Sequence, residues 1–234
     1  MGCPKNLVDS EVMLGILKER GYEITDELIK SDVAIVNTCS FIDDAKEESI
    51  DTILHLAELK REGRFKGLIV TGCLPQRYPE ELYTELKEVD GFLGTGEFYR
   101  IADIVEEVVL GKRPRRIDKP DFLYDHLMPR ERITPSHYAY IKIAEGCNNP
   151  CTFCVIPKLR GHYRSRPLES ILKEAEQLVE NGVQEIILIS QDTTLYGMDI
   201  YKKPSITMLL KKLNYKEEAL KKHYPIKETL VFQH

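Results

Sequence analysis

Three cysteines at nearly equal intervals constrain how this chain can fold. Cys39 lies 36 residues after Cys3, and Cys73 lies 34 residues after Cys39. That interval is about the length of one strand-helix-strand unit. Cys39 and Cys73 each follow a short run, residues 33–36 and 68–71, of the apolar, β-branched kind that parallel sheets bury on both faces. Because parallel strands end on one edge of their sheet, we expect the three thiols to converge there.

A structural interpretation of these cysteines stays open, because isolated cysteines often fill tight turns as small buried residues. Repetition of the same position three times favours a shared ligand site instead. Gly2 and Gly72 stand directly before Cys3 and Cys73, and glycine lets the backbone approach a bulky ligand closely. Disulfides are not expected for six cysteines in a reducing compartment, so metal ligation is the stronger interpretation.

Alternating helix and strand patterns predict an α/β protein. Helices are expected at residues 9–20, 43–59, 79–87 and 97–110, with a further strand near 92–93. We predict a doubly wound, parallel-sheet N-terminal domain over residues 1–110. Residues 111–136 contain scattered prolines without a sustained apolar period, and they are expected to form a linker or wrapping segment.

The second predicted domain covers residues 137–234 and looks like the opening of a parallel barrel. A strand is expected at 138–143, a helix with Pro167 at its first position, and a buried strand at 186–189. A complete barrel needs several more strand-helix steps, and only about forty residues remain. The barrel is therefore predicted to be incomplete.

Cys147, Cys151 and Cys154 fall within eight residues, directly after the first strand of this domain, so one loop can wrap one inorganic centre. Four thiolates would close a cubane cluster, whereas three leave one iron without a protein ligand. Such an open position suits a site that activates a small molecule. A zinc site that takes His162 as its fourth ligand is the alternative.

A C-x3-C-x2-C loop after a strand, at the start of a barrel-like domain, resembles the radical S-adenosylmethionine (SAM) superfamily. The resemblance implies that Cys147, Cys151 and Cys154 ligate three irons of a [4Fe-4S] cluster and that SAM chelates the fourth. Electron transfer to SAM then releases a 5′-deoxyadenosyl radical. A reducing partner such as flavodoxin is implied as well.

Four motifs in order resemble the methylthiotransferases: Gly-Cys-Pro-Lys-Asn at residues 2–6, Asn-Thr-Cys at 37–39, Thr-Gly-Cys at 71–73, and the radical SAM loop. This resemblance implies a second, auxiliary [4Fe-4S] cluster on Cys3, Cys39 and Cys73, and transfer of a methylthio group to an unactivated carbon. Pro4 and Lys5 resemble the RimO branch, which modifies an aspartate of the twelfth small-subunit ribosomal protein. The transfer-RNA branch tends to have Gly-Cys-Gln there. The implied partner is that ribosomal protein or the ribosome, with transfer-RNA adenosine as the alternative substrate.

Two departures from the family pattern predict a truncated chain. Family members begin with a strand before the Gly-Cys pair and continue into a full barrel and an RNA-binding-type TRAM domain. Here Met1 directly precedes Gly2, and the resemblance ends near Asn214, with residues 215–234 outside it. We therefore expect the chain to hold clusters but to turn over poorly. A non-catalytic iron-sulfur or zinc-binding fragment is the remaining alternative.

Two further groups of residues are candidates for ligand contact. Gln191 and Asp192 end the second barrel strand, where such folds bind ligands, and they are candidate SAM contacts, although helix capping explains Asp192 equally well. A basic stretch follows the cysteine loop, and it either meets an anionic group such as the SAM carboxylate or forms a solvated surface. Its members are Lys158, Arg160, His162, Arg164 and Arg166.

Composition limits the location and the partners of the chain. The formal net charge is −5, so the molecule lacks the overall basic field of a protein that grips nucleic acid by its phosphates. No apolar run approaches the roughly 20 residues that cross a bilayer, and the first residues do not have the pattern of a secretory signal. A cytoplasmic protein without membrane contact is expected.

Overall fold

The computed structural model describes residues 2–221, with side chains described as far as residue 214. It divides into two compact units. Unit 1 comprises Met1–Phe122, Pro129–Glu131 and Cys151–Gly161, and unit 2 comprises Leu123–Met128, Arg132–Pro150 and His162–His234. Met1 and residues 222–234, at the outer ends of the two predicted domains, lie outside the described residues. Most of the predicted unmatched tail at 215–234 lies outside them too.

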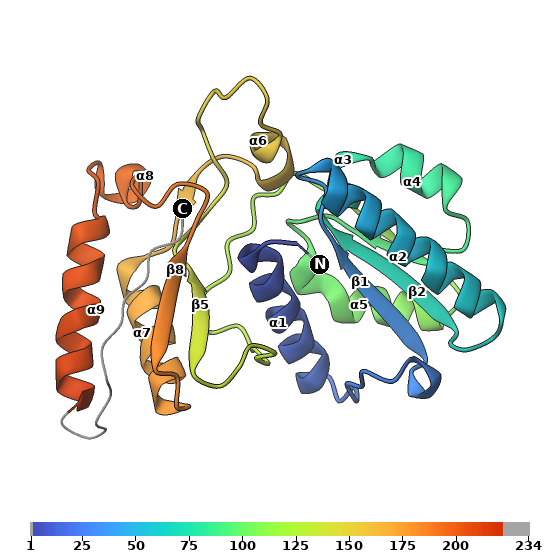
Figure 1. The fold of residues 1–234 in the computed structure, drawn as a ribbon, viewed down its shortest axis with the longest axis horizontal. Helices are drawn as coiled ribbons and strands as arrows, with labels where there is room; N and C mark the ends of the chain where they lie inside the picture. The colour runs from blue at the N-terminus through green and yellow to red at the C-terminus, as the bar shows by residue number, and fades with distance from the viewer. Residues whose placement is uncertain (1, 222–234) are drawn as a thin grey trace. The chain divides into compact units, whose positions relative to one another are not determined.

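Unit 1 is built on a parallel sheet with the strand order β1-β2-β3-β4, and Figure 1 shows its strands β1 and β2 side by side. The strands are β1 (Val33–Thr38), β2 (Gly67–Gly72), β3 (Gly91–Leu93) and β4 (Arg115–Arg116). In the β1–β2 pair, Val33 lies opposite Gly67 and Thr38 lies opposite Gly72. Strands β1 and β2 thus end level with each other, and the residue after each is a cysteine, Cys39 and Cys73.

Helices cover both faces of this sheet. The helices of unit 1 are α1 (Pro4–Glu19), η1 (Leu28–Lys30), α2 (Asp43–Arg61), α3 (Cys73–Arg77), α4 (Pro79–Glu85), η2 (Phe98–Arg100), α5 (Ile101–Val109) and α6 (Ile156–Arg160). On one face, Val36 and Val70 share a buried cluster with Ile53 of α2. On the other, a Cβ added to Gly67 would lie 2.7 Å from Val108 of α5, so that helix packs directly on the sheet. The predicted doubly wound α/β arrangement is confirmed.

Helix α1 begins at Pro4, so the predicted start at Asp9 is wrong. Cys3 is the N-cap residue in an extended conformation, and the Leu7 amide donates to the Cys3 carbonyl over 3.2 Å. Proline suits the first helical position, because its missing N–H would have no partner there in any case. Asp9 and Ser10 lie inside the helix, and the start of the helix therefore places Cys3 at its N-terminus.

The segment at 111–136 wraps parts of the chain rather than only linking them. It contributes β4 to the edge of the sheet, and Arg113 donates hydrogen bonds to the carbonyls of Tyr83, Leu86 and Val89. Within unit 1, a Cβ on Gly15 would lie 2.5 Å from the Pro129 backbone, which shows how closely this segment packs on α1. Its residues are shared between both units, and the predicted domain boundaries stay predictions.

Unit 2 contains a parallel strand pair and its crossover helix. Its elements are β5 (Tyr138–Lys142), β6 (Ala144–Glu145), β7 (Arg164–Ser165), α7 (Leu168–Glu180), β8 (Glu185–Ile189), α8 (Met198–Tyr201) and α9 (Ile206–Lys221). Strands β5 and β8 are parallel neighbours, with Ile141 opposite Leu188, and both residues belong to a core that includes Ile171 of α7. The β5-α7-β8 order is the predicted strand-helix step. Pro167 is the N-cap rather than the first helical residue, because its ψ of 140° is extended.

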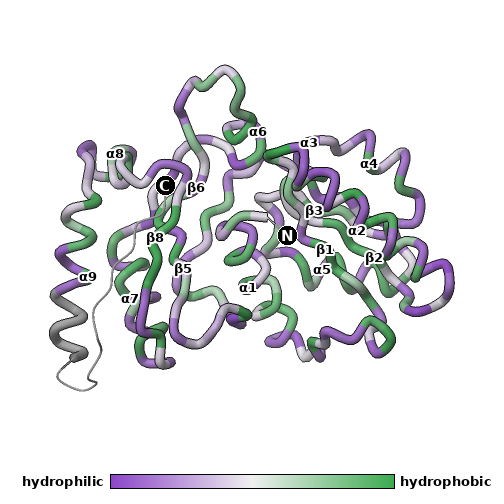
Figure 2. Tube along the Cα trace, in the orientation of Figure 1, coloured by the Kyte–Doolittle hydropathy of each residue, from purple (hydrophilic) through white to green (hydrophobic). Residues whose placement is uncertain are grey.

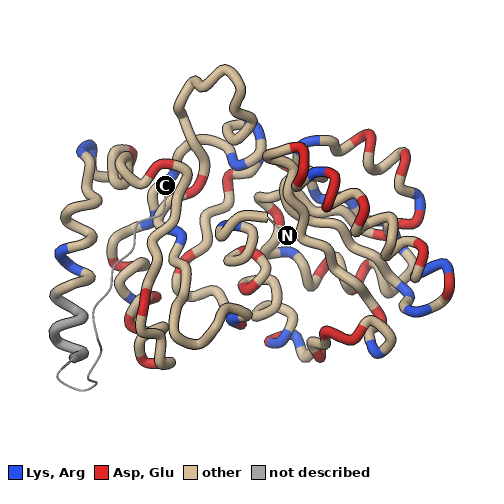
Figure 3. The backbone as a smooth tube through the Cα atoms, viewed as in Figure 1, with Lys and Arg blue, Asp and Glu red and all other residues tan. Residues whose placement is uncertain are grey.

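Apolar residues concentrate along the strands, whereas charged residues are spread over many elements. Figure 2 shows apolar segments along the strands of unit 1 and mainly hydrophilic residues along α2. Lys and Arg are distributed over many elements among acidic residues, rather than gathered in one stretch (Figure 3). Within residues 2–221, no helix has both the length and the apolar character needed to cross a membrane.

Candidate metal centres

Unit 1 brings Cys3, Cys39 and Cys73 to the same edge of its sheet. Cys39 follows β1, Cys73 opens α3 directly after β2, and Cys3 caps α1. A Cβ on Gly2 would lie 3.2 Å from the Cβ of Cys39. Cys39 and Cys73 are buried, whereas Cys3 is exposed. The predicted approach of the three thiols is therefore present in the structure, while their role as ligands stays a prediction.

Gly72 makes the position of Cys73 possible. Its φ is +96°, and a Cβ there would lie 2.4 Å from the Asn37 side-chain oxygen and 2.5 Å from the Thr38 carbonyl oxygen. A side chain at this point would force β1 and β2 apart at the ends where their cysteines follow. Only glycine lets the strand turn at once into α3, with Cys73 as its first residue.

The surroundings of Cys73 are those of a ligand set rather than of an isolated thiol. Burial raises the pKa of the Cys73 thiol, and nearby Cys3 and Cys39 raise it further, while the Arg160 cation opposes them. Thiolates crowded together in this way need a positive centre to hold their charge, and a metal supplies one. The donor set thus fits an iron-sulfur cluster.

The unit 1 thiols share an edge of the sheet but do not meet at one point. Among the residues that the structure describes, no three His, Cys, Asp or Glu side chains are placed to hold one metal ion. A [4Fe-4S] cube puts several atoms between its thiolate ligands. Thiols that share an edge without meeting at one point therefore still suit it.

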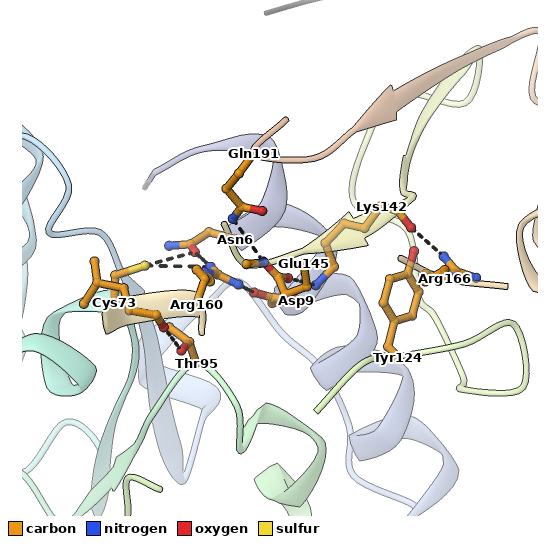
Figure 4. Close-up of polar contacts among 12 residues, drawn as sticks. Asn6, Asp9, Cys73, Thr95, Tyr124, Lys142, Glu145, Arg160, Arg166 and Gln191 are labelled. Atoms are coloured by element: carbon orange, nitrogen blue, oxygen red, sulfur yellow. Dashed lines mark hydrogen bonds and ion pairs between the residues drawn. The ribbon is translucent and has the colours of Figure 1, made fainter. Parts of the chain in front are cut away.

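A buried polar network lies beside Cys73 (Figure 4). The Arg160 Nη1 donates to Asp9 Oδ2 over 2.6 Å, and its Nη2 contacts Asn6 Oδ1 and lies 3.8 Å from Cys73 Sγ. Asn6 in turn donates to the Thr38 carbonyl over 2.7 Å. All these residues belong to unit 1. Arg160 thus joins the helix after Cys3 to the thiol after β2, and Asn6 extends this network to the end of β1.

The C-x3-C-x2-C loop runs from unit 2 into unit 1. Cys147 is buried in unit 2, and its Sγ lies 3.4 Å from the Asn149 amide. Cys151 and Cys154 belong to unit 1, where the Cys154 amide donates to the Cys151 carbonyl over 3.1 Å. The grouping of these three thiols rests on their spacing in the chain.

In unit 2, polar side chains gather after β5 and β8. Gln191 Nε2 donates to Glu145 Oε1 over 3.1 Å, and Lys142 Nζ donates to Glu145 Oε2 over 3.0 Å. Within the described part of the chain, the buried Oε1 of Gln191 has no hydrogen-bond partner. Gln191 thus keeps one acceptor for a ligand.

Asp192 differs from its neighbour, because its oxygens are occupied. It accepts hydrogen bonds from the Thr194 amide over 3.0 Å and from Asn149 Nδ2 over 3.1 Å. Burial disfavours its charge, but the hydrogen bonds from Thr194 and Asn149 outweigh burial and lower its pKa. A turn-stabilising role accounts for Asp192, and its predicted contact with SAM stays a prediction.

The basic stretch after the loop is not one solvated surface. Arg160 and Arg166 are almost fully buried, and Arg166 pairs with Glu174 of unit 2 over 2.5 Å. Lys158 and His162 are exposed, and His162 Nδ1 lies 3.2 Å from the Asn148 side-chain oxygen. The solvated interpretation is therefore wrong for the two buried arginines.

Comparison with known proteins identifies the family. The chain matches the uncharacterized protein family UPF0004 over residues 1–94 and the Radical SAM superfamily over residues 141–230. Proteins named ribosomal protein uS12 methylthiotransferase RimO are 55% identical in Heliobacterium modesticaldum and 57% identical in Geobacter sulfurreducens. These alignments cover 91% of this chain, and 46% and 48% of the relatives. The chain is thus similar to RimO-type methylthiotransferases along 91% of its length.

The chain spans about half the length of the curated RimO relatives that it matches. Among solved structures, it resembles a radical SAM methyltransferase, TsrM from Kitasatospora setae, with a TM-score of 0.61 and 14% identity. That likeness covers 94% of this chain and 49% of TsrM, and it concerns the fold alone. The predicted fold class and family are confirmed.

Three residues of the candidate RimO-type site were missed from the sequence. Asn6 stands in the Gly-Cys-Pro-Lys-Asn motif, which carried the resemblance without a role for this amide. Asp9 was assigned to a helix start, and Arg160 to a basic stretch. Asn6, as the last residue of that motif, is the one for which the sequence held a signal.

Proposed function

We propose that this chain takes part in methylthiolation of an aspartate of the ribosomal protein uS12 by radical SAM chemistry. The relatives that carry this name are 51–57% identical to it, and this observation carries the proposal. The convergence of Cys3, Cys39 and Cys73 at one sheet edge supports it, because a sulfur-transferring enzyme of this kind needs a second metal centre.

Two [4Fe-4S] clusters and SAM are the proposed cofactors. Cys147, Cys151 and Cys154 would hold the cluster that binds SAM, and Cys3, Cys39 and Cys73 would hold the auxiliary cluster. When bound, these groups supply a carbon radical and a site for the sulfur that is transferred. Three thiolate ligands per cluster leave one iron open in each, which suits both tasks.

The protein's own residues hold and shield these sites. Gly72 lets Cys73 reach the sheet edge, and Arg160 places a positive charge beside its sulfur. In unit 2, the Lys142–Glu145 pair fixes Gln191 by one end of its amide and leaves the other end for SAM. The buried pair is held by direct hydrogen bonds, so it can keep Gln191 in place without solvent.

The setting of the reaction is proposed on the same grounds. We expect a reducing partner such as flavodoxin, because release of the radical from SAM needs an electron. We also expect a cytoplasmic location, because the substrate named for the relatives is a ribosomal protein. We also propose the domain ranges 1–110, 111–136 and 137–234 as the functional division of the chain. Transfer RNA is the competing substrate in the test below.

The test starts with metal content. The 234-residue chain, reconstituted without oxygen, should hold about eight irons, and replacement of either cysteine triad by alanine should leave about four. Zinc in place of iron and sulfide would contradict the proposal. Incubation with SAM, a reductant and either uS12 or transfer RNA, followed by mass spectrometry, then separates the substrates. A methylthio group on transfer RNA alone would reject the uS12 assignment.

A further inference from the structure

Arg160 is a charged residue whose side chain lies in the interior of unit 1. It ends α6, six residues after Cys154, and only 2% of it is exposed. The contact of Thr95 Oγ1 with the Leu159 carbonyl oxygen fixes the backbone beside it within unit 1. A charged side chain at such depth is costly unless its partners satisfy it. The residues that contact the guanidinium should therefore indicate its role.

Those partners orient the guanidinium toward the thiol. Asp9, itself 3% exposed, accepts a hydrogen bond from Nη1. The second nitrogen, Nη2, contacts Asn6 Oδ1 and lies 3.8 Å from Cys73 Sγ (Figure 4). A planar guanidinium can donate hydrogen bonds to two partners in fixed, different directions, which a lysine ammonium does less well.

We propose that Arg160 is a positioning residue that sets the reduction potential of the auxiliary cluster through Cys73. This proposal rests on the proposed function, since it requires a cluster on Cys3, Cys39 and Cys73. Hydrogen bonds to cluster sulfurs and nearby positive charge both favour the reduced, more negative state and so raise the potential. Asp9 acts in the opposite direction, because its negative charge pairs with the same guanidinium and offsets its positive charge.

A purely structural role is the competing explanation. A buried Arg–Asp pair that only joins α1 to α6 would affect stability when it is broken, and it would leave the cluster potential unchanged. The sign of the shift separates the two explanations. Removal of the cation and removal of the anion both break the pair, but only an electrostatic role gives them opposite effects on the potential.

The experiment uses the whole chain with Cys147, Cys151 and Cys154 replaced by alanine, so that only the auxiliary cluster is present. The potential is measured by redox titration, with electron paramagnetic resonance of the reduced cluster as the readout. Arg160→Gln should shift the potential to more negative values, and Asp9→Asn should shift it to more positive values. Arg160→Lys, which keeps the charge, should restore part of the loss.

Lys158→Gln is the matched control, because it removes an exposed positive charge from the same helix, and its potential should stay close to the parent's. Arg160→Gln leaves Asp9 without its main partner, so the double variant Asp9→Asn/Arg160→Gln is tested as well. It removes both buried charges, and its potential should still fall below the parent's.

Equal potentials in Arg160→Gln, Asp9→Asn, the double variant and Lys158→Gln, with the cluster present in all four, would overturn the role of Arg160. Shifts of the same sign in Arg160→Gln and Asp9→Asn would overturn it too. A parent that holds no cluster on its unit 1 cysteines would reject the auxiliary-cluster assignment itself. The two failures are thus distinguishable.

Discussion

The two cysteine triads of this chain are assembled by different means. Cys147, Cys151 and Cys154 fall within eight residues, so their spacing allows a single loop to carry all three. Cys3, Cys39 and Cys73 are far apart in the sequence, and they share one edge of the sheet because β1 and β2 end level with each other and α1 begins beside them. The loop triad depends on its local sequence spacing. The unit 1 triad depends on correct folding of a whole sheet. Damage to the fold should therefore affect the second triad much more than the first.

The largest expected effect tests whether loss of a buried ion pair of unit 2 leaves iron binding by the unit 1 thiols unchanged. Arg166→Met removes the partner of Glu174, which is buried in unit 2, and should cost about 4 kcal/mol of unfolding free energy. Urea denaturation measures this loss. The iron bound by the unit 1 triad should stay at the parent level in a variant that lacks the loop cysteines.

Lys173→Met is the control, because Lys173 is exposed on α7, the helix that carries Glu174, and it should change stability by less than about 0.5 kcal/mol. Loss of unit 1 iron in Arg166→Met under folding conditions would mean that the two triads are not independent, and it would weaken the comparison.

The next effect breaks the triad that depends on the sheet. Gly72→Ala places a Cβ against Asn37 and Thr38 at a positive φ, and it should cost about 3 kcal/mol. The variant should lose the unit 1 iron and keep the loop iron, so that its content falls from about eight to about four.

Gly63→Ala is the matched control, because Gly63 also has a positive φ but no atom lies within 4 Å of its added Cβ. It should cost about 1 kcal/mol and keep both clusters. If Gly72→Ala retained all of its iron, the sheet edge would not be what positions Cys73.

The same contrast explains what the sequence could and could not predict. The approach of Cys39 and Cys73 follows from two apolar, β-branched runs, residues 33–36 and 68–71, each of which ends shortly before a cysteine. The start of α1 was misplaced, because Asp9 and Ser10 have the composition of a helix cap while the chain had already entered the helix at Pro4. Arg160 could not be assigned, since its partner Asp9 is 151 residues away and no local pattern links them. Local signals predict elements, whereas contacts across the chain need the fold.

A smaller effect concerns the amide that joins α1 to the end of β1. Asn6→Ala removes the donor to the Thr38 carbonyl and one acceptor of Arg160, so two buried polar groups lose a partner. The expected cost is about 2 kcal/mol in urea denaturation. Asn181→Ala, at an exposed amide after α7, should cost less than about 1 kcal/mol. Equal costs for both would show that the network around Cys73 adds little to folding.

The smallest expected change in stability lies in unit 2 and tests function instead. Gln191→Leu removes an amide whose Oε1 has no partner among the described residues, so the lost hydrogen bond to Glu145 is offset and stability should change by less than about 1 kcal/mol. Binding of SAM to the reconstituted chain, measured by equilibrium dialysis, should nevertheless weaken by about tenfold, which corresponds to one lost hydrogen bond in a buried site.

Gln177→Leu, on the exposed face of α7, should leave both stability and SAM binding at the parent level. Unchanged SAM binding in Gln191→Leu would remove Gln191 from the site. In that case the ends of β5 and β8 would serve only to shape the loop that carries Cys147.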